Sequence, residues 1–147
     1  MKPLNQVTIE FLSRSVNESF ARSAAACFAA QLDPTLEEIN DIKTAVSEAV
    51  TNCIVHAYRH GEGLIYITVS LLEGRAAKIE IRDRGCGIAD VRQAREPLYT
   101  TDREGERSGM GFTVMENFCD GVRVSSVLGK GTTVTLLKRL NGRTQAT

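Results

Sequence analysis

The sequence predicts an α+β fold, a two-layer sandwich in which helices cover one face of a mainly antiparallel sheet. Two observations lead to this prediction. Apolar residues recur at helical spacing in the first half of the chain, most clearly over residues 35–59. Further along, apolar and polar residues alternate in two pairs of segments, each joined by a glycine-containing turn. Helices grouped ahead of and between antiparallel hairpins are typical of such a sandwich.

Length and charge limit the possible functions. The 147 residues fit one domain, and a polar tail over residues 139–147 is expected to be disordered. The 18 basic and 18 acidic side chains cancel, which removes the long-range field on which nucleic-acid and anionic-membrane binders rely. The longest apolar run, residues 24–30, is too short to span a membrane, and the N-terminus lacks a signal-peptide pattern. We therefore expect a cytoplasmic protein whose partner is a nucleotide or a protein.

The first elements expected are a strand and a helix. Residues 7–11 have the pattern of a short strand, and the capping-box spacing of Ser15 and Glu18 opens a helix that ends near residue 31. The inward stripe of this helix is expected to consist of Phe20, Ala24, Cys27 and Phe28. Arg22 lies about 200° around the helix from Phe20, so its guanidinium should face solvent. The four cysteines have no Cys-x-x-Cys spacing and are expected to be reduced thiols.

A longer helix is expected over residues 35–59. Thr35 and Glu38 have capping-box spacing directly after Pro34. The apolar residues that recur at helical period are Leu36, Ile39, Ile42, Val46, Val50, Cys53 and Ala57.

Three polar residues lie along the border of that apolar face. Glu48, Asn52 and His56 recur every four positions, so an acid, an amide oxygen and an imidazole project toward one place. Small neighbours, Ala45 and Ala49, leave room there for a ligand, and the set suits an ATP site. A solvated flank with an accidental acid is the alternative, and the glycine-rich segments further along favour the ligand site.

The second half of the chain is expected to form two antiparallel hairpins with helices between them. In chain order, the elements are strands over residues 65–71 and 77–81, a short helix near 90–96, a mobile loop to residue 108, a helix over 111–118, and strands over 122–128 and 132–138.

Asp83 follows the second strand of the first hairpin, and the alternation of residues along that strand predicts the face on which it lies. Counting by twos from Ala77 places Asp83 on the buried face. A buried carboxylate needs a partner, and the amino group of a nucleotide base is one, with Gly85 and Gly87 removing side chains from its approach. The alternative is a turn aspartate bonded to backbone amides.

The last strand and the last helix offer two further candidates. The same parity count directs the Thr132 hydroxyl inward, where it could help to bind the base, although an ordinary strand threonine would show the same pattern. Gly109 and Gly111 precede a helix whose free N-terminal amides could hold phosphate oxygens. A Walker loop is excluded because Gly129-Lys130 is followed by glycine instead of Ser or Thr.

Four segments in order resemble the nucleotide-binding boxes of the gyrase, Hsp90, histidine kinase and MutL ATPase superfamily. They are EAVTNCIVH (48–56), DRGCGI (83–88), PLYTT with RSGMGF (97–101 and 107–112) and GKGTT (129–133). Within this superfamily, NESFAR (17–22) and VMENFCD (114–120) are most similar to the sporulation anti-sigma F factors, which are serine protein kinases. The resemblance covers about residues 7–138 and implies a single kinase domain with the Bergerat-type ATP-binding fold.

The resemblance implies a role for each matching residue. Glu48 would be the general base that takes the proton from the attacking hydroxyl, and Asn52 would ligate Mg²⁺. Asp83 would receive the adenine amino group, supported through water by Thr132. The other residues implied at the ATP site are Gly85 and Gly87 beside Asp83, and Thr101, Arg107, Ser108, Gly109 and Gly111 near the phosphates, with residues 97–108 as a lid. Cys86, between two glycines, departs from the small aliphatic residue expected in close relatives.

The resemblance also implies partners. The chain would bind and inhibit a sporulation sigma factor, phosphorylate a serine of its anti-anti-sigma antagonist with ATP and Mg²⁺ as cofactors, and form a homodimer. Glu18 and Arg22 would form the surface that both partners share. The alternatives that remain open are an anti-sigma kinase of a stress-response sigma factor, a nucleotide-gated binding module without significant kinase activity, and a chaperone-like or gyrase-like ATPase.

Overall fold

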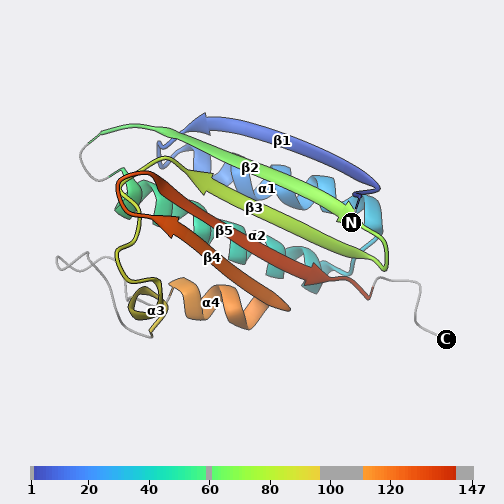
Figure 1. The fold of residues 1–147 in the computed structure, drawn as a ribbon. Coiled ribbons are helices and arrows are strands. Elements are labelled where there is room, and N and C mark those ends of the chain that lie inside the picture. Colours follow the sequence, from blue (N-terminus) through green and yellow to red (C-terminus); the bar gives the residue numbers. More distant parts are fainter. Residues whose placement is uncertain (1, 59–60, 97–110, 142–147) are drawn as a thin grey trace.

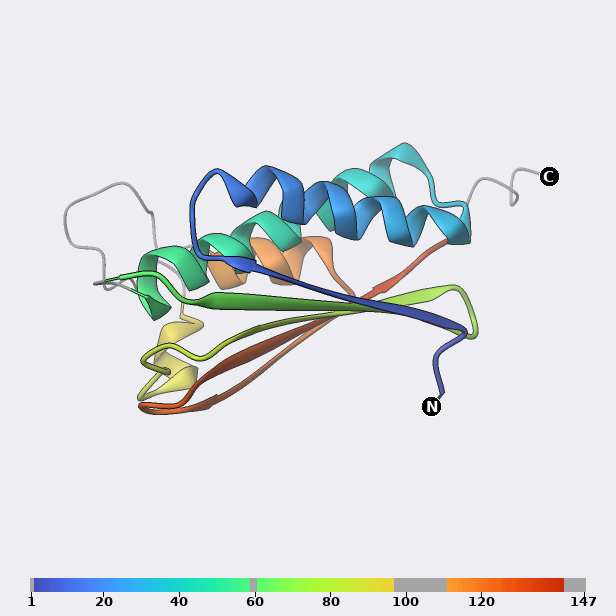
Figure 2. The same cartoon turned by 90° about the horizontal axis from the view of Figure 1, so that it is seen from above.

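Helices cover one face of a five-stranded antiparallel sheet, as Figures 1 and 2 show. The computed structural model describes residues 2–58, 61–96 and 111–141. Its strands are β1 (Asn5–Leu12), β2 (Leu64–Leu72), β3 (Ala76–Asp83), β4 (Gly121–Val127) and β5 (Gly131–Arg139), in the spatial order β1-β2-β3-β5-β4. Its helices are α1 (Asn17–Ala29), the 3₁₀ turn η1 (Ala30–Leu32), α2 (Leu36–Asn52), the π turn η2 (Cys53–Ala57), α3 (Val91–Ala94) and α4 (Gly111–Phe118). The predicted α+β sandwich is confirmed.

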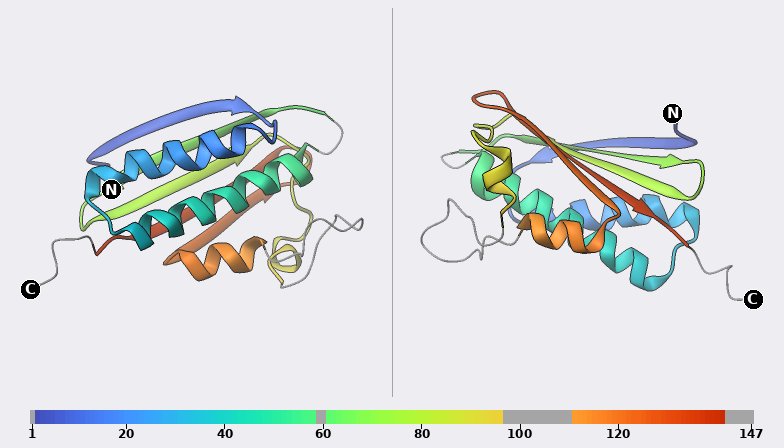
Figure 3. Two further views of the ribbon diagram at one scale, coloured as in Figure 1. Left: turned by 180° about the vertical axis from the view of Figure 1, so that it is seen from behind. Right: turned by 60° about the horizontal axis from the view of Figure 1, so that its bottom comes forward.

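Helix α2 lies between α1 and α4 on the covered face of the sheet, as Figure 3 shows from the helix side. The core forms where α2 meets the central strands. Its largest fully buried side chains are Ile42, Val46 and Val50 from α2, Ile65, Ile67 and Val69 from β2, Ile79 and Ile81 from β3, Met115 from α4, and Leu136 from β5. Burial of this kind contributes about 1.5 to 3 kcal/mol for each large aliphatic side chain. It holds α2 and β3, which carry the candidate site residues, in one rigid arrangement.

Helix α1 differs from the prediction in its start and in its rotation. Val16 is the N-cap residue and makes no side-chain cap hydrogen bond, so the capping box predicted at Ser15 does not form. The buried residues are alanines: Ala21, Ala25, Ala26 and Ala29. Phe20 is 55% exposed and Cys27 is exposed, so the predicted inward stripe is wrong for both. Since this helix is apolar on most of its circumference, periodicity does not single out one face, and the small alanines are the side chains that permit close packing on α2.

Helix α2 begins as predicted and ends differently. The Thr35 side chain accepts a hydrogen bond from the Glu38 N–H (3.1 Å), and the Thr35 N–H donates to Glu38 Oε1 (2.8 Å). This reciprocal pair is the predicted capping box. The α-helix ends at Asn52, and the chain continues as the π turn, in which the Tyr58 N–H donates to the Cys53 carbonyl (3.2 Å).

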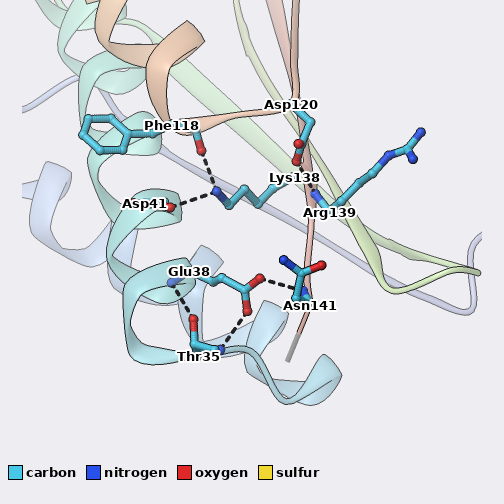
Figure 4. Close-up of polar contacts among 8 residues, drawn as sticks. All are labelled: Thr35, Glu38, Asp41, Phe118, Asp120, Lys138, Arg139 and Asn141. Atoms are coloured by element: carbon cyan, nitrogen blue, oxygen red, sulfur yellow. Dashed lines mark hydrogen bonds and ion pairs between the residues drawn. The ribbon is translucent and has the colours of Figure 1, made fainter. Parts of the chain in front are cut away.

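The C-terminal end of β5 is attached to the helices by the polar contacts in Figure 4. Lys138 Nζ donates to Asp41 Oδ2 on α2 and to the Phe118 carbonyl at the end of α4, each at 2.9 Å. Glu38, which closes the capping box of α2, also accepts a hydrogen bond from the Asn141 N–H (2.6 Å). These contacts therefore fix the C-terminal end of β5 against α2 and α4.

The expected tail boundary at residue 139 is too early. Arg139 belongs to β5, Leu140 is 4% exposed, and the Leu140 N–H donates to the Arg75 carbonyl (2.7 Å). Residues 142–147 lie outside the described residues. Among the helices that the structure describes, none has the length and apolar character that crossing a membrane requires.

Candidate functional site

The polar stripe of α2 meets the first residue of α4. Glu48 and Asn52 are both partly buried. A Cβ atom placed on Gly111 would lie 3.2 Å from both terminal atoms of the Asn52 side chain and 3.4 Å from Glu48 Oε2. The first backbone amides of a helix have no partner within that helix. A carboxylate, an amide oxygen and a helix N-terminus, predicted from separate segments, are thus brought to one place.

His56 follows Glu48 and Asn52 in a different kind of turn. It lies in the π turn, which starts one residue after Asn52. The His56 carbonyl accepts a hydrogen bond from the Cys86 thiol (3.3 Å).

Asp83 is buried at the end of β3, as strand parity predicts, with 6% of its surface exposed. Its Oδ1 accepts hydrogen bonds from the Gly85 N–H (2.9 Å) and the Thr132 N–H (3.2 Å). The Cys53 thiol, a weak donor, lies 3.5 Å from Oδ2. The backbone-bonded alternative therefore also holds: Oδ1 fixes the turn, while Oδ2 keeps capacity to accept from a ligand.

Burial sets the protonation of this pair. Desolvation raises the pKa of Asp83 above the ordinary 3.8, opposed by the hydrogen bonds from Gly85, Cys53 and Thr132. Burial, and then the charge of Asp83, raise the pKa of Cys53 well above 9.0. The thiol therefore keeps its proton at neutral pH and acts as a donor to the carboxylate.

Thr132 faces inward, as predicted, and sequence reasoning missed its neighbour Ser126. Thr132 is 8% exposed, and its hydroxyl lies 2.8 Å from Ser126 Oγ. Ser126 also accepts a hydrogen bond from the Ile88 N–H (2.7 Å), which ties the glycine-rich segment to the last hairpin. Strand alternation could have predicted this neighbour, because Ser126 lies two residues after Val124 on the inward face of β4, opposite Thr132.

The glycines after Asp83 are in close contact with other parts of the chain. A Cβ atom on Gly85 would overlap the Ala57 carbonyl oxygen at the end of the π turn. A Cβ atom on Gly87, whose φ is +76°, would overlap the Val127 carbonyl oxygen. The space predicted to be open for a ligand is thus filled by backbone at these two positions. The glycines allow the segment to fit between the π turn and the last hairpin.

Four predicted site residues, Thr101, Arg107, Ser108 and Gly109, and the expected lid over residues 97–108 lie outside the described residues.

Glu18 and Arg22 form a pair on α1. Arg22 Nη1 lies 3.2 Å from Glu18 Oε1, and the two side chains are 38% and 30% exposed. Thr51, on α2, hydrogen-bonds to Glu18 Oε2 (3.2 Å). The Arg22 side chain is therefore accessible to solvent and paired with a residue one turn away on its own helix.

Known proteins share this fold and much of this sequence. A family model described as a histidine kinase-like ATPase domain matches residues 11–138. The chain is 58% identical over 134 residues to the anti-sigma F factor of Caldanaerobacter subterraneus subsp. tengcongensis, covering 91% of this chain and 93% of that relative. It is 55% identical over 138 residues to the anti-sigma F factor of Clostridium beijerinckii, covering 93% of this chain and 96% of the relative. The chain belongs to the anti-sigma F factor family.

Solved structures agree with this family at the level of the fold. The RsbU and RsbW domains of a Mycobacterium tuberculosis protein superpose with a TM-score of 0.68 at 21% identity, covering 94% of this chain and 33% of that one. The histidine kinase domain of a blue-light activated kinase from Erythrobacter litoralis gives a TM-score of 0.58 at 19% identity, covering 86% of this chain and 60% of that one. By its relatives and its family model, the chain is an anti-sigma factor built on a histidine kinase-like ATPase domain.

Proposed function

We propose that this chain binds a sporulation sigma factor of the sigma F type and uses Mg·ATP to phosphorylate a serine of the anti-anti-sigma antagonist. The arrangement of Glu48 and Asn52 against Gly111 carries the catalytic part of the proposal. The partners follow from the names of the relatives, which are anti-sigma F factors at more than half identity.

Glu48 and Asn52 have different roles in the proposed reaction. Glu48 accepts the proton of the attacking serine hydroxyl, and Asn52 offers an amide oxygen to Mg²⁺. Mg²⁺ prefers oxygen ligands and is usually held by one or two protein groups together with phosphates and water. The amide oxygen of Asn52, which lies beside the first residue of α4, fits this ion. The metal supplies charge neutralisation at the transferred phosphoryl group.

The base of ATP is proposed to lie against Asp83. Oδ2 of Asp83, which the weak Cys53 donor also contacts, accepts a hydrogen bond from the adenine amino group. Thr132 supports this contact through water. Gly85 and Gly87 keep this segment in place. In the proposal, the residues that complete the phosphate site come from the segment outside the described residues, namely Thr101, Arg107, Ser108 and Gly109.

Substitution of Glu48 by glutamine tests the reaction. The amide keeps the shape of the side chain but accepts protons poorly, so phosphotransfer from labelled ATP to the antagonist should fall by about 10² to 10⁴. ATP affinity should remain close to that of the parent. As a control, Asn52→Ala should weaken Mg·ATP binding itself. Undiminished phosphotransfer in Glu48→Gln would remove Glu48 from its role, and a parent that binds ATP without labelling the antagonist would leave a nucleotide-gated binding module.

The pair of Glu18 and Arg22 is proposed as the docking surface for both partners, on a homodimer of this chain. Arg22→Glu should weaken capture of the sigma factor and of the antagonist while ATP affinity stays unchanged, because the charge reversal lies on α1. Arg123→Glu is the matched control: it makes the same charge change on an exposed residue of β4, at the opposite edge of the sheet. Equal losses in the two variants, or none in Arg22→Glu, would move the docking surface elsewhere.

A further inference from the structure

The hydroxyl of Tyr58 bridges two strands at the end of the sheet that carries Asp83. Its O–H donates to the Leu64 carbonyl (2.7 Å), and its oxygen accepts from the Arg84 N–H (2.6 Å). Ile65 and Asp83 are Cα partners in the ladder between β2 and β3. Leu64 and Arg84 are therefore the next facing pair, and the hydroxyl joins their backbone groups where the two strands stop pairing.

The local structure is built to hold the Tyr58 ring in this position. A Cβ atom on Gly63 would overlap the ring, so the absence of a side chain there gives the ring its place. The ring is partly buried. Burial is the largest cause that raises the pKa of Tyr58 above 10.0, and the hydroxyl keeps its proton for the bond to Leu64.

Hydrogen bonds besides that of Tyr58 join the π turn region to residues 83–86 in the described part of the chain. They include the Cys53 thiol on Asp83 (3.5 Å), the Cys86 N–H on the Ala57 carbonyl (3.1 Å) and the Cys86 thiol on the His56 carbonyl. At 2.6 Å, the link from Tyr58 to the Arg84 N–H is the shortest of these, and it acts one residue from Asp83.

We propose that Tyr58 is a positioning residue for base specificity, whose hydroxyl determines where the Asp83 carboxylate stands. The inference rests on the proposed ATP site. Without the hydroxyl, the Arg84 N–H and the Leu64 carbonyl lose their shared partner, and unpaired backbone groups are costly. The backbone at Arg84 then shifts toward another partner, and the adjacent Asp83 carboxylate moves from the position that faces a base amino group.

Tyr58→Phe is the direct test, since phenylalanine keeps the ring and removes the hydroxyl alone. The dissociation constant for ATP should rise about tenfold, as expected when one positioned hydrogen bond is lost, and the preference for ATP over GTP should shrink by a similar factor. Tyr66→Phe is the matched control. The Tyr66 ring lies beside the guanidinium groups of Arg82 (4.7 Å) and Arg84 (5.0 Å), and its loss of a hydroxyl should leave both quantities unchanged.

A double-variant cycle with Asp83→Asn identifies the route of the effect. If Tyr58 acts through Asp83, removal of the hydroxyl in the Asp83→Asn background changes the ratio of ATP to GTP affinity no further. An unchanged ratio in Tyr58→Phe, or equal losses for ATP and GTP, would overturn the inference and leave the ATP site standing. A parent chain that binds no ATP would overturn the site and this inference together.

Discussion

Asp83 combines a structural and a binding role in one carboxylate. Its Oδ1 organises the turn through two backbone N–H groups, and its burial raises its pKa above the ordinary 3.8. The folded chain therefore binds a proton at Asp83 more tightly than the unfolded chain. The stability that this proton contributes is fully present below 3.8 and is lost as the pH rises through the folded pKa.

The first prediction at this scale concerns Asp83→Asn. The asparagine oxygen still accepts from Gly85 and Thr132, so the fold should be kept, and the stability difference between variant and parent should grow in favour of the variant as the pH rises from acid to neutral. ATP binding should weaken by about 1.5 to 3 kcal/mol because a charge-assisted hydrogen bond is lost. Urea unfolding at a series of pH values and ATP titration measure the two effects. A parallel pH dependence in both proteins would contradict the burial argument.

At the scale of elements, α4 is fixed at both ends. Its first residue lies against Asn52, and its last carbonyl accepts from Lys138, which also pairs with Asp41 on α2. The Lys138 and Asp41 side chains are 14% and 19% exposed. A pair with so little solvent contact depends on both partners, since removal of one leaves a charge without compensation.

We predict that Lys138→Met lowers the free energy of unfolding by about 3 kcal/mol and that Asp41→Leu in the same chain restores most of it. Lys78→Met is the control, because the pair of Lys78 with Glu80 is long (3.8 Å) and its side chains are 40% and 37% exposed. That change should cost about 0.5 kcal/mol or less. Denaturant unfolding distinguishes the cases, and similar losses for both lysines would show that burial of the first pair is energetically irrelevant.

At the scale of the whole molecule, the elements that carry the candidate site and the C-terminal contacts of Figure 4 lie at opposite ends of the sheet, as the ribbon in Figure 1 shows. The site gathers the end of α2, the end of β3 and the turn between β4 and β5. At the other end, Glu38 and Asn141 close the chain on the start of α2. This separation allows the fold to be tested without touching the site.

Two truncations make that test. Relative to a chain that stops after Asn141, one that stops after Lys138 should lose about 3 kcal/mol, because the buried Leu140 and the bond to Glu38 are removed. ATP affinity, measured where both chains are folded, should be equal. Thermal unfolding and ATP titration provide the measurements, and equal stability of the two truncations would show that Leu140 and Asn141 add nothing to the fold.

The sequence by itself determined several features that depend on local spacing, although not the start or the buried face of α1. The period of α2, its capping box at Thr35 and the strand parity of Asp83 and Thr132 follow from backbone geometry over a few residues, and the structure confirms each of them. The four nucleotide-binding segments, in their order along the chain, were enough to recognise the family. Glu48 and Asn52 could be placed side by side from the sequence, because they are one helical turn apart wherever the helix lies.

Only the tertiary structure decided how these segments meet. The face that α1 buries and the backbone that fills the space beside Gly85 depend on contacts between residues far apart in the chain. The bridging hydroxyl of Tyr58 is of the same kind. A spacing rule counts residues along one element. The buried face of an apolar helix is instead selected by its packing against other elements, and the backbone donors and acceptors that Tyr58 joins arise where two strands stop pairing. Both depend on interaction energies that exist only once the elements are assembled.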